Sequence, residues 1–134
     1  MNTMEDIRKT LNQARRMLSP KIMVKHMCGT SEYEPIQYTT WKEYWLKESE
    51  LRGTYKSFPQ QKELCPCCGK NTNPEDFVGG HIETVAEPKK QYITLVCREC
   101  NSTYGKGKQP SPEFAAKEYD CVEFQMSKSR IRKP

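Results

Sequence analysis

Four cysteines stand in two closely spaced pairs, and each pair has the Cys-x-x-Cys spacing. Two thiolates at this spacing approach one metal ion from a single tight turn, and two such turns supply the four ligands of a tetrahedral zinc. Pro66 and Gly69 suit the turn of the first pair, which argues against the alternative of four free thiols in a reducing cell. Because four thiolates leave no open coordination position, we expect this zinc to be structural. The predicted ligands are Cys65, Cys68, Cys97 and Cys100.

A histidine between the two pairs adds possible chemistry to this scaffold. His81 and Glu83 are two residues apart, so their side chains share one face of an expected strand. Asn101 follows the last cysteine and begins a helix that we expect to pack across that face. The three side chains would then converge beside the zinc. Such a group suits metal-assisted phosphodiester hydrolysis, in which His81 activates a water and a divalent metal stabilises the developing charge. The alternative is that His81 is an ordinary packed or hydrogen-bonded strand residue.

The residue types around the cysteines predict the elements that must position these side chains. Residues 77–85 alternate loosely between apolar and polar positions, and residues 91–96 are rich in β-branched and aromatic side chains, so both ranges are predicted strands. Residues 86–89 form the turn between them, and a short helix is expected over residues 101–106. The order is cysteine pair, strand, strand, cysteine pair, helix. We therefore expect an α+β fold with a zinc-stapled ββα unit at residues 62–108.

This stretch resembles the HNH, or ββα-metal, endonucleases, and in particular the zinc-containing branch that includes phage Holliday-junction resolvases of the endonuclease VII type. The resemblance covers about a third of the chain. It implies that His81 is the general base, and that Asn101 either binds the catalytic metal, Mg²⁺ or another divalent cation, or orients the base. The resemblance rests on three motifs, Cys65-Pro-Cys-Cys68-Gly69, Gly80-His81-Ile82 and Leu95-Val-Cys97-Arg-Glu-Cys100-Asn101.

The chain departs from that family in two places. Gly80 stands where nuclease members commonly carry an Asp or His metal ligand directly before the base. Residues 102–106 contain no strong ligand, although many members have a final histidine or acid in the short helix. Glu83 and Asp76 are the candidates to substitute for the missing ligand. The implied function is an HNH-like endonuclease with His81 as its base. The alternative is an inactive zinc module that binds nucleic acid or a protein partner.

The overall composition fits one small polar domain with a polyanionic partner. The chain has 134 residues, of which 35% are hydrophobic and 29% are charged, and its mean hydropathy is −0.91. With so thin a core, zinc binding should supply a real share of the folding free energy. The net charge of +5 and the pI of about 8.8 give a mild bias toward a polyanionic partner, and the resemblance to the endonucleases implies that this partner is nucleic acid, DNA in particular. A solvated basic surface without a polyanionic partner is the alternative.

The cysteine count and the lack of long apolar stretches predict the cellular compartment. An odd count of seven cysteines favours metal ligation in a reducing compartment over a disulfide framework. Cys67 lies inside the first pair and is a possible competing ligand, whereas Cys28 and Cys121 are expected to be buried or free thiols. No stretch resembles a signal peptide or a membrane span. We therefore expect a cytoplasmic protein without a membrane partner.

The N-terminal range, residues 1–61, is predicted to be helical. A capping box at Thr3 and Asp6 starts a helix over residues 3–18, whose apolar stripe is expected to dock on the rest of the protein. Contact of its basic face with phosphates is the alternative. A second capping box, at Thr40 and Glu43, starts a helix that should end at Gly53. The intervening residues 21–37 are expected to be irregular apart from a short apolar piece at 22–24. One face of the second helix carries Trp41, Tyr44, Trp45 and Leu51. Core packing is expected for this stripe, with base stacking of its aromatic rings or a protein partner as alternatives.

The C-terminal range, residues 109–126, is expected to pack on the zinc unit as a helix and a strand. Ser111-Pro112 suits a helix start with proline at the first helical position, so a helix is predicted over residues 114–119. A closing strand is predicted over residues 121–124. Residues 127–134 form a basic tail, of which residues 128–133 are expected to be disordered.

Overall fold

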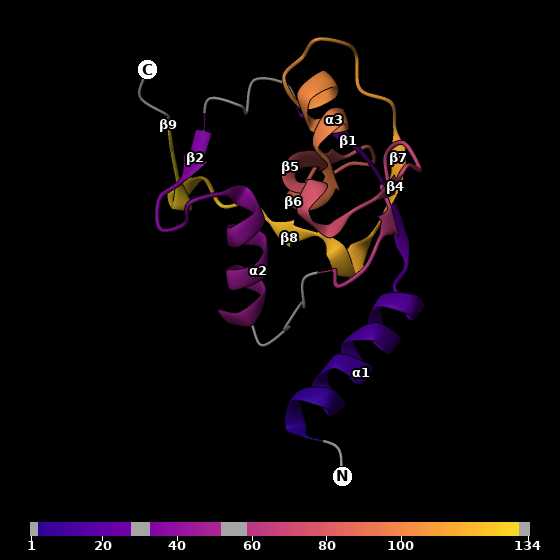
Figure 1. Cartoon of the computed structure of the whole chain (residues 1–134). Coiled ribbons are helices and arrows are strands. Elements are labelled where there is room, and N and C mark those ends of the chain that lie inside the picture. The colour runs from indigo at the N-terminus through magenta and orange to yellow at the C-terminus, as the bar shows by residue number, and fades with distance from the viewer. Residues whose placement is uncertain (1–2, 28–32, 52–58, 132–134) are drawn as a thin grey trace.

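A five-stranded antiparallel sheet lies at the centre of the computed structural model, which describes residues 3–27, 33–51 and 59–131 (Figure 1). Helices and further strands surround the sheet, so the predicted α+β class is confirmed. Two-stranded sheets join β2 (Tyr33–Pro35) to β9 (Ser129–Ile131) and β3 (Glu63–Leu64) to β4 (Asn71–Thr72). The strands of the central sheet follow in the order β7 (Phe114–Lys117), β1 (Lys21–His26), β5 (Phe77–Thr84), β6 (Gln91–Cys97) and β8 (Val122–Glu123).

Strands β5 and β6 form the hairpin expected between the two cysteine pairs. Their register sets His81 opposite Ile93 and Phe77 opposite Cys97. Cys97, the first cysteine of the second pair, is thus the last residue of β6. The chain then turns into α3 (Arg98–Cys100) and a π-helical turn over Asn101–Gly105. The expected helix after the second pair is therefore present, although it begins three residues earlier than predicted.

Strand β1 corrects the expectation that residues 21–37 are irregular. Its alternate residues Val24 and His26 are buried, and it pairs with β5 on one side and with β7 on the other. The helix predicted over residues 114–119 is wrong for a related reason. Phe114 and Ala116 alternate into the core, and the free edge of β1 supplies backbone partners, so these residues extend as β7. A 3₁₀ turn, Glu118–Asp120, and β8 follow.

Helix α2 (Trp41–Leu51) covers one face of the sheet. Thr40 caps it as predicted, because its Oγ1 accepts a hydrogen bond from the Glu43 amide at 3.1 Å. Tyr44 and Trp45 are buried against the sheet, which confirms core packing for these two rings and leaves them unavailable to bases or partners. Trp41 is partly buried, whereas Leu51, expected on the same face, is 73% exposed. The predicted end at Gly53 lies outside the described residues. The core on this face comprises Tyr44, Trp45, Phe77, Ile93, Leu95, Val122 and Phe124.

The opposite face of the sheet carries a second core that reaches the cysteine pairs. Buried apolar side chains of β1, β5, β6 and β7 meet there beneath the turn of the first pair and beneath α3. The two cores are separated by the sheet itself, so each strand residue belongs to one side or the other. The members of the second core are Val24, Cys65, Ile82, Val96, Cys97, Cys100, Phe114 and Ala116.

Helix α1 (Met4–Leu18) extends away from the sheet (Figure 1). Its capping box is present as predicted, because Thr3 and Asp6 exchange side-chain hydrogen bonds with each other's backbone amides at 3.1 and 3.2 Å. The expectation that its apolar stripe docks is wrong. The helix is held by its polar side, where Asn12 is buried and Arg16 binds the carboxylates of Glu63 and Asp120. The polar face of α1 therefore contacts the rest of the protein, and its apolar face remains exposed to solvent.

The C-terminal residues through Ile131 are ordered, contrary to the expected disorder of residues 128–133. Strand β9 pairs with β2, which sets Glu34 opposite Arg130. In the 3₁₀ turn before it, Met126–Lys128, the ammonium of Lys128 binds the carboxylate of Glu48, a residue of α2 that is only 1% exposed. A basic residue of the supposed tail thus neutralises a buried acid. Residues 132–134 lie outside the described residues.

Candidate metal centre and the residues around it

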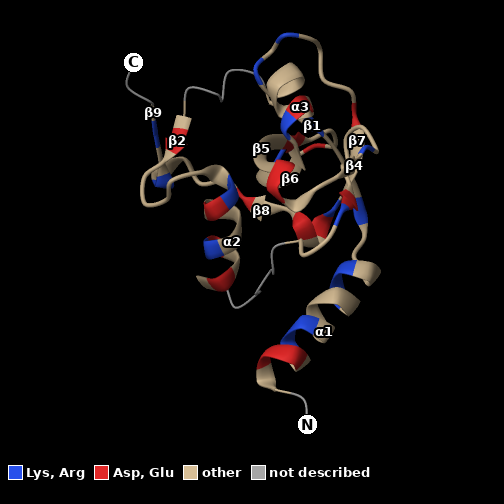
Figure 2. Ribbon diagram, viewed as in Figure 1, with Lys and Arg blue, Asp and Glu red and all other residues tan. Residues whose placement is uncertain are grey.

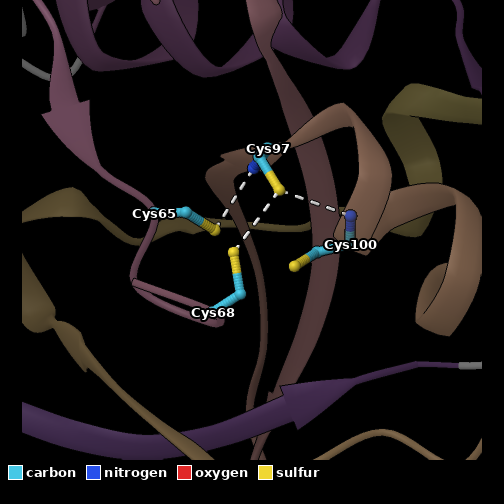
Figure 3. Close-up of side chains that lie close together, drawn as sticks. All are labelled: Cys65, Cys68, Cys97 and Cys100. Atoms are coloured by element: carbon cyan, nitrogen blue, oxygen red, sulfur yellow. Dashed lines mark hydrogen bonds between the residues drawn. The ribbon is translucent and has the colours of Figure 1, made fainter. Parts of the chain in front are cut away.

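The four predicted cysteines meet at one point (Figure 3), and three of them, Cys65, Cys97 and Cys100, belong to the second core. Cys65 and Cys68 lie in the turn between β3 and β4, Cys97 is the last residue of β6, and Cys100 lies in α3. Their sulfur atoms all lie within 4.8 Å of one another, and the Sγ atoms of Cys68 and Cys97 are 3.8 Å apart. In a tetrahedral zinc site with Zn–S bonds of about 2.3 Å, sulfurs are separated by about 3.8 Å. The four sulfurs therefore have the spacing of a metal site.

Backbone amides point at these sulfurs, as dashed lines show for two of them in Figure 3. The amide of Cys97 donates to Cys65 Sγ, that of Cys100 donates to Cys97 Sγ and that of Lys70 donates to Cys68 Sγ, each at 3.4 Å. Such bonds favour the thiolate form and orient it. Gly69 makes the turn possible, because its φ of +77° lies in the left-handed region. The cluster could therefore hold a metal ion, and its donor set is compatible with structural zinc.

Cys67 does not belong to this group, although it lies between two of its members. The side chain is half-buried and packs on the core beside the cluster. Burial raises the pKa of its thiol to about 11, and its sulfur is not among the four that lie within 4.8 Å of one another. Cys121 is also half-buried, and its Sγ donates to the Lys117 carbonyl. Cys28 lies outside the described residues.

His81 lies on the α2 side of the sheet, in an aromatic pocket. Its ring centroid is 4.5 Å from that of Trp41 and 4.8 Å from that of Phe124, both edge-on. The side chain is 6% exposed, and within the described residues neither ring nitrogen has a hydrogen-bond partner. Burial lowers its pKa to about 4, so the imidazole is neutral at physiological pH. This environment is that of a packed strand residue.

Asn101 lies on the other side of the same strand. A Cβ atom on Gly80 would stand 3.6 Å from Asn101 Oδ1, whereas a Cβ atom on Gly79 would stand 2.6 Å from the backbone of Trp41 in α2. Successive residues of a strand point to opposite faces, so His81 shares the face of Gly79 and not that of Gly80. The helix after the second cysteine pair therefore packs across the Gly80 face. The expected convergence of His81 with Asn101 does not occur.

Glu83 and Asp76 are also remote from a common centre. Glu83 shares the face of His81, as expected from their spacing, but its carboxylate lies near the ammonium groups of Lys25 and Lys89, at 3.8 and 3.7 Å. These ion pairs neutralise it at the end of the hairpin. Asp76 lies in a 3₁₀ turn, Pro74–Asp76, directly before β5. Among the described residues, no other cluster of three or more His, Cys, Asp or Glu side chains could hold a metal ion.

A second histidine, which the sequence interpretation overlooked, lies on the side of Asn101. His26 of β1 is 3% exposed, and within the described chain neither of its ring nitrogens has a hydrogen-bond partner. A Cβ atom on Gly105 would stand 2.8 Å from Asn101 Oδ1 and 4.0 Å from His26 Nδ1, so both side chains border this glycine. The signal that could have revealed His26 is its alternation with Ile22 and Val24 along one strand face.

The surroundings of His26 are mainly aromatic. Its ring packs on Tyr104 and Phe114, with centroid distances of 5.7 and 5.4 Å, and its backbone amide donates to Ser111 Oγ at 2.9 Å. Burial lowers its pKa to about 4. Each face of the sheet therefore carries one buried, neutral histidine.

Comparisons with protein families, with curated proteins and with solved structures find no significant match to this chain. Within the described ranges, no helix combines the length and the apolar character that a membrane crossing requires.

Proposed function

We propose that this protein is a nucleic-acid-binding module of the HNH type, held together by a structural zinc, in which His81 does not serve as a general base. Exposed Lys106 and Lys108 in the loop after the metal centre carry the proposed binding, and the placement of His81 and Asn101 on opposite faces of β5 argues against His81 as a base. A general base must reach the water that the metal and substrate present. His81 instead faces Trp41 and Phe124, with the whole sheet between it and Asn101.

The structural role of zinc is supported by the closed donor set. Four cysteines supply four ligands, and the amides that point at them stabilise the thiolates. The ion would connect the β3–β4 turn to the end of β6 and the start of α3, and thereby fix the ββα unit. When bound, zinc would cross-link these segments, and its four cysteine ligands would leave no open coordination position for a substrate or water.

A basic loop beside the metal centre is the proposed nucleic-acid contact. The loop leaves the π-helical turn at Gly105 and carries Lys106 and Lys108, both exposed, on the way to β7 (Figure 2). From Asn101 to Pro112 the chain contains no acidic residue. Exposed lysines free of acidic neighbours bind phosphates, release counterions and give salt-dependent affinity without sequence preference.

Binding of the zinc-loaded chain to a labelled DNA duplex, measured over a range of salt concentrations, tests this proposal. The double variant Lys106→Ala/Lys108→Ala should weaken binding and reduce the slope of log K against log salt by about 1.8, because each lost phosphate contact contributes about 0.9. The control Lys9→Ala/Lys90→Ala removes two exposed lysines elsewhere and should leave the slope nearly unchanged. Equal losses of affinity and of salt slope in both variants would show that binding depends on net charge alone. No binding at low salt would refute the proposal.

A metal-dependent nuclease is the second candidate, and the proximity of His26 to Asn101 favours it. Both side chains border Gly105, and Asn101 supplies the carboxamide that the HNH resemblance assigns to the catalytic metal. In this arrangement His26, rather than His81, would accept the proton of the attacking water. His26 is 3% exposed, so this function requires the side chains that cover its ring, Tyr104 and Phe114 among them, to move aside.

Nicking of supercoiled plasmid with Mg²⁺ or Mn²⁺ separates the candidates. If the chain is a nuclease centred on His26, then His26→Gln and Asn101→Ala should abolish nicking while zinc content is retained, and His81→Phe should preserve it. If His81→Phe alone abolishes nicking, His81 is the base despite its pocket. If the wild-type chain binds DNA but does not nick it with either metal, the nuclease candidate fails and the binding module stands.

A further inference from the structure

A cavity that the functions above do not use lies beside helix α1. Its volume is about 900 Å³, within the range of roughly 300–1,000 Å³ that is usual for small-molecule sites. Residues of α1, β6 and β7 line it, together with residues of the segment 59–66 and of the 3₁₀ turn after β7. The lining includes buried side chains such as Trp45 and Thr94 and exposed ones such as Gln13 and Gln61. The cavity therefore reaches from the core to solvent.

Two lysines stand opposite each other at this cavity. Lys21 of β1 and Lys117 of β7 are paired positions of an antiparallel ladder, so their side chains share one face, and both line the cavity. The Cβ atoms of such a pair are roughly 4.5–5.5 Å apart, and like charges placed so close destabilise a sheet. Within the described residues, neither lysine forms an ion pair. Two positive charges thus stand together without a counter-charge.

The acidic residues of the lining are already engaged. Asp120 accepts two hydrogen bonds from Nε of Arg16, at 3.1 and 3.0 Å, and Glu63 accepts one from Nη1 of the same guanidinium. Among the described residues, no other Asp or Glu lines the cavity. Three cations therefore face two acids, and both acids lie on the arginine, which leaves the surplus of positive charge at the two lysines. We expect an anionic ligand.

The lysine pair favours a phosphomonoester over other anions. A phosphomonoester carries a charge of about −1.5 to −2 at pH 7, so one group compensates both ammonium groups. A carboxylate carries a single charge and would leave one lysine without a counter-charge. Lysine binds phosphate as a point charge on a flexible stem, so two lysines of neighbouring strands can converge on one phosphate.

A phosphate fills only a small part of the cavity, and carboxamides supply much of the remaining polar lining. A carboxamide presents a donor and an acceptor side by side, which is the arrangement that pairs with the edge of a nucleobase. The apolar lining, for example Leu95 and Ala115, suits the faces of a flat ring. A phospholipid would instead need an apolar channel long enough for its acyl chains. The carboxamides are those of Asn12, Gln13, Gln60 and Gln61.

We propose that this cavity binds a nucleoside monophosphate, whose phosphate lies at Lys21 and Lys117 and whose base contacts the carboxamides. The ligand is bound without a chemical step. The site shares no residue with the loop of Lys106 and Lys108, so the inference goes beyond the function proposed above and does not depend on it.

Isothermal titration calorimetry of the full zinc-loaded chain tests this inference with the monophosphates of adenosine, guanosine, cytidine and uridine. At least one of the four should bind. The matching nucleoside lacks the phosphate and ribose phosphate lacks the base. Each should therefore bind at least about tenfold more weakly than the nucleotide, because each loses hydrogen bonds that the nucleotide makes.

Substitutions separate the two halves of the site. Lys117→Gln should weaken binding of the nucleotide and of ribose phosphate alike, by about tenfold, because both carry the phosphate. The double variant Gln13→Ala/Gln61→Ala changes two exposed side chains and should weaken only the nucleotide. The control Lys90→Gln removes an exposed lysine that does not line the cavity and should change neither affinity.

The melting temperature of the ligand-free chain distinguishes a binding role of the lysine pair from a structural one. Lys117→Gln removes a contact between like charges, so this variant should melt no lower than the wild type. A lower melting temperature would show that Lys117 stabilises the fold through a partner within the chain, and the assignment of the lysine pair to a ligand would fail.

Three binding results would also overturn the inference. The first is that none of the four nucleotides binds at millimolar concentration. The second is that Lys21→Gln and Lys117→Gln leave the affinity unchanged. The third is that ribose phosphate binds as tightly as the nucleotide, which would assign the cavity to sugar phosphates. Lys106→Ala/Lys108→Ala should bind the nucleotide as the wild type does, so a failure of duplex binding is distinguishable from a failure of this site.

Discussion

Trp41 and Gly79 are in backbone contact: a Cβ atom placed on Gly79 would stand 2.6 Å from the carbonyl carbon of Trp41 and 2.7 Å from the amide nitrogen of Lys42. This approach lets α2 lie directly on β5 and carries the Trp41 ring over His81. The contact thus decides what surrounds His81. The neighbouring Gly80 faces a different constraint, since a Cβ there would come too close only to a flexible group, a methyl of Val96 at 2.9 Å, while Asn101 Oδ1 at 3.6 Å is at ordinary contact distance.

Alanine at these two glycines should therefore have unequal effects. Gly79→Ala forces the backbone of α2 away from the sheet and should lower the free energy of unfolding by about 2–3 kcal/mol. Gly80→Ala requires only a shift of the Val96 side chain and should cost less than about 1.5 kcal/mol. Urea unfolding monitored by tryptophan fluorescence measures both. Equal losses would show that the contact between Trp41 and Gly79 does not limit this packing.

Zinc content should depend on Cys97 and not on Cys67. Cys97→Ser removes one of four ligands and should abolish stoichiometric zinc, with a loss of stability on the order of 5 kcal/mol or more, because metal binding supplies folding free energy. Cys67→Ser changes a half-buried thiol outside the cluster and should retain one zinc per chain. Elemental analysis with thermal melting reads out both variants.

Chelation of the wild-type chain gives the same comparison without a substitution. Complete zinc removal should unfold the region that the metal would join, β3, β4 and the segment after β6. An unchanged far-ultraviolet spectrum and melting temperature after complete removal would contradict the structural role.

Stability should fall in mild acid because two buried histidines resist protonation. Burial lowers the pKa of both His81 and His26 from 6.5 to about 4. As the pH falls from about 6.5 to about 4, these histidines therefore bind protons in the unfolded chain but not in the folded chain. Across that window each histidine lowers the free energy of unfolding by on the order of 3 kcal/mol. Above pH 6.5 both are neutral in either state and this contribution is fully present.

Urea unfolding between pH 7 and pH 4.5 measures this effect. His81→Phe keeps an aromatic ring in the pocket of Trp41 and Phe124 but cannot titrate, so its stability should decline less steeply than that of the wild type. Protonation of the cysteine ligands affects both proteins, and the difference between them isolates His81. Parallel curves would mean that His81 titrates normally in the folded state.

Removal of the Lys128 ammonium should expose the cost of a buried carboxylate. Glu48 is 1% exposed, and besides Lys128 it accepts a hydrogen bond from Tyr38 Oη at 3.3 Å. Lys128→Met leaves the Glu48 charge without its cation and should destabilise the fold by about 2 kcal/mol, less than for a fully buried pair because the lysine is partly exposed. Adding Glu48→Gln to Lys128→Met should recover part of the loss. A double variant no more stable than Lys128→Met alone would contradict this account.

The features that sequence patterns predicted correctly are those set by local interactions. Thr3 and Thr40 cap their helices through contacts three residues away, and the β-branched run before Cys97 forms a strand next to its own hairpin partner. The four cysteines are likewise grouped by spacing within two short turns. Such signals require no knowledge of distant segments.

The features that were missed depend on distant partners. Residues 114–117 lack a pattern of their own strong enough to outweigh the helix start suggested by Pro112, and they extend because β1 offers an edge. The side of the hairpin that Asn101 crosses was equally undetermined, since α2 occupies the other side through Gly79. The polar face of α1 lies against the body because Arg16 binds Glu63 and Asp120. A hydrophobic pattern does not indicate such a contact between charged residues.

Strand β1 shields one edge of β5 along its pairing with residues 82–84. A fragment cut to the two cysteine pairs and the hairpin would keep all four sulfurs but lose this cover. The amide and carbonyl groups of β5 would then be open to strands of neighbouring molecules, which is the situation that leads to edge-to-edge aggregation or strand exchange. Residues 21–26 thus protect the hairpin from self-recognition, and a minimal version of the metal centre must include β1 or block that edge.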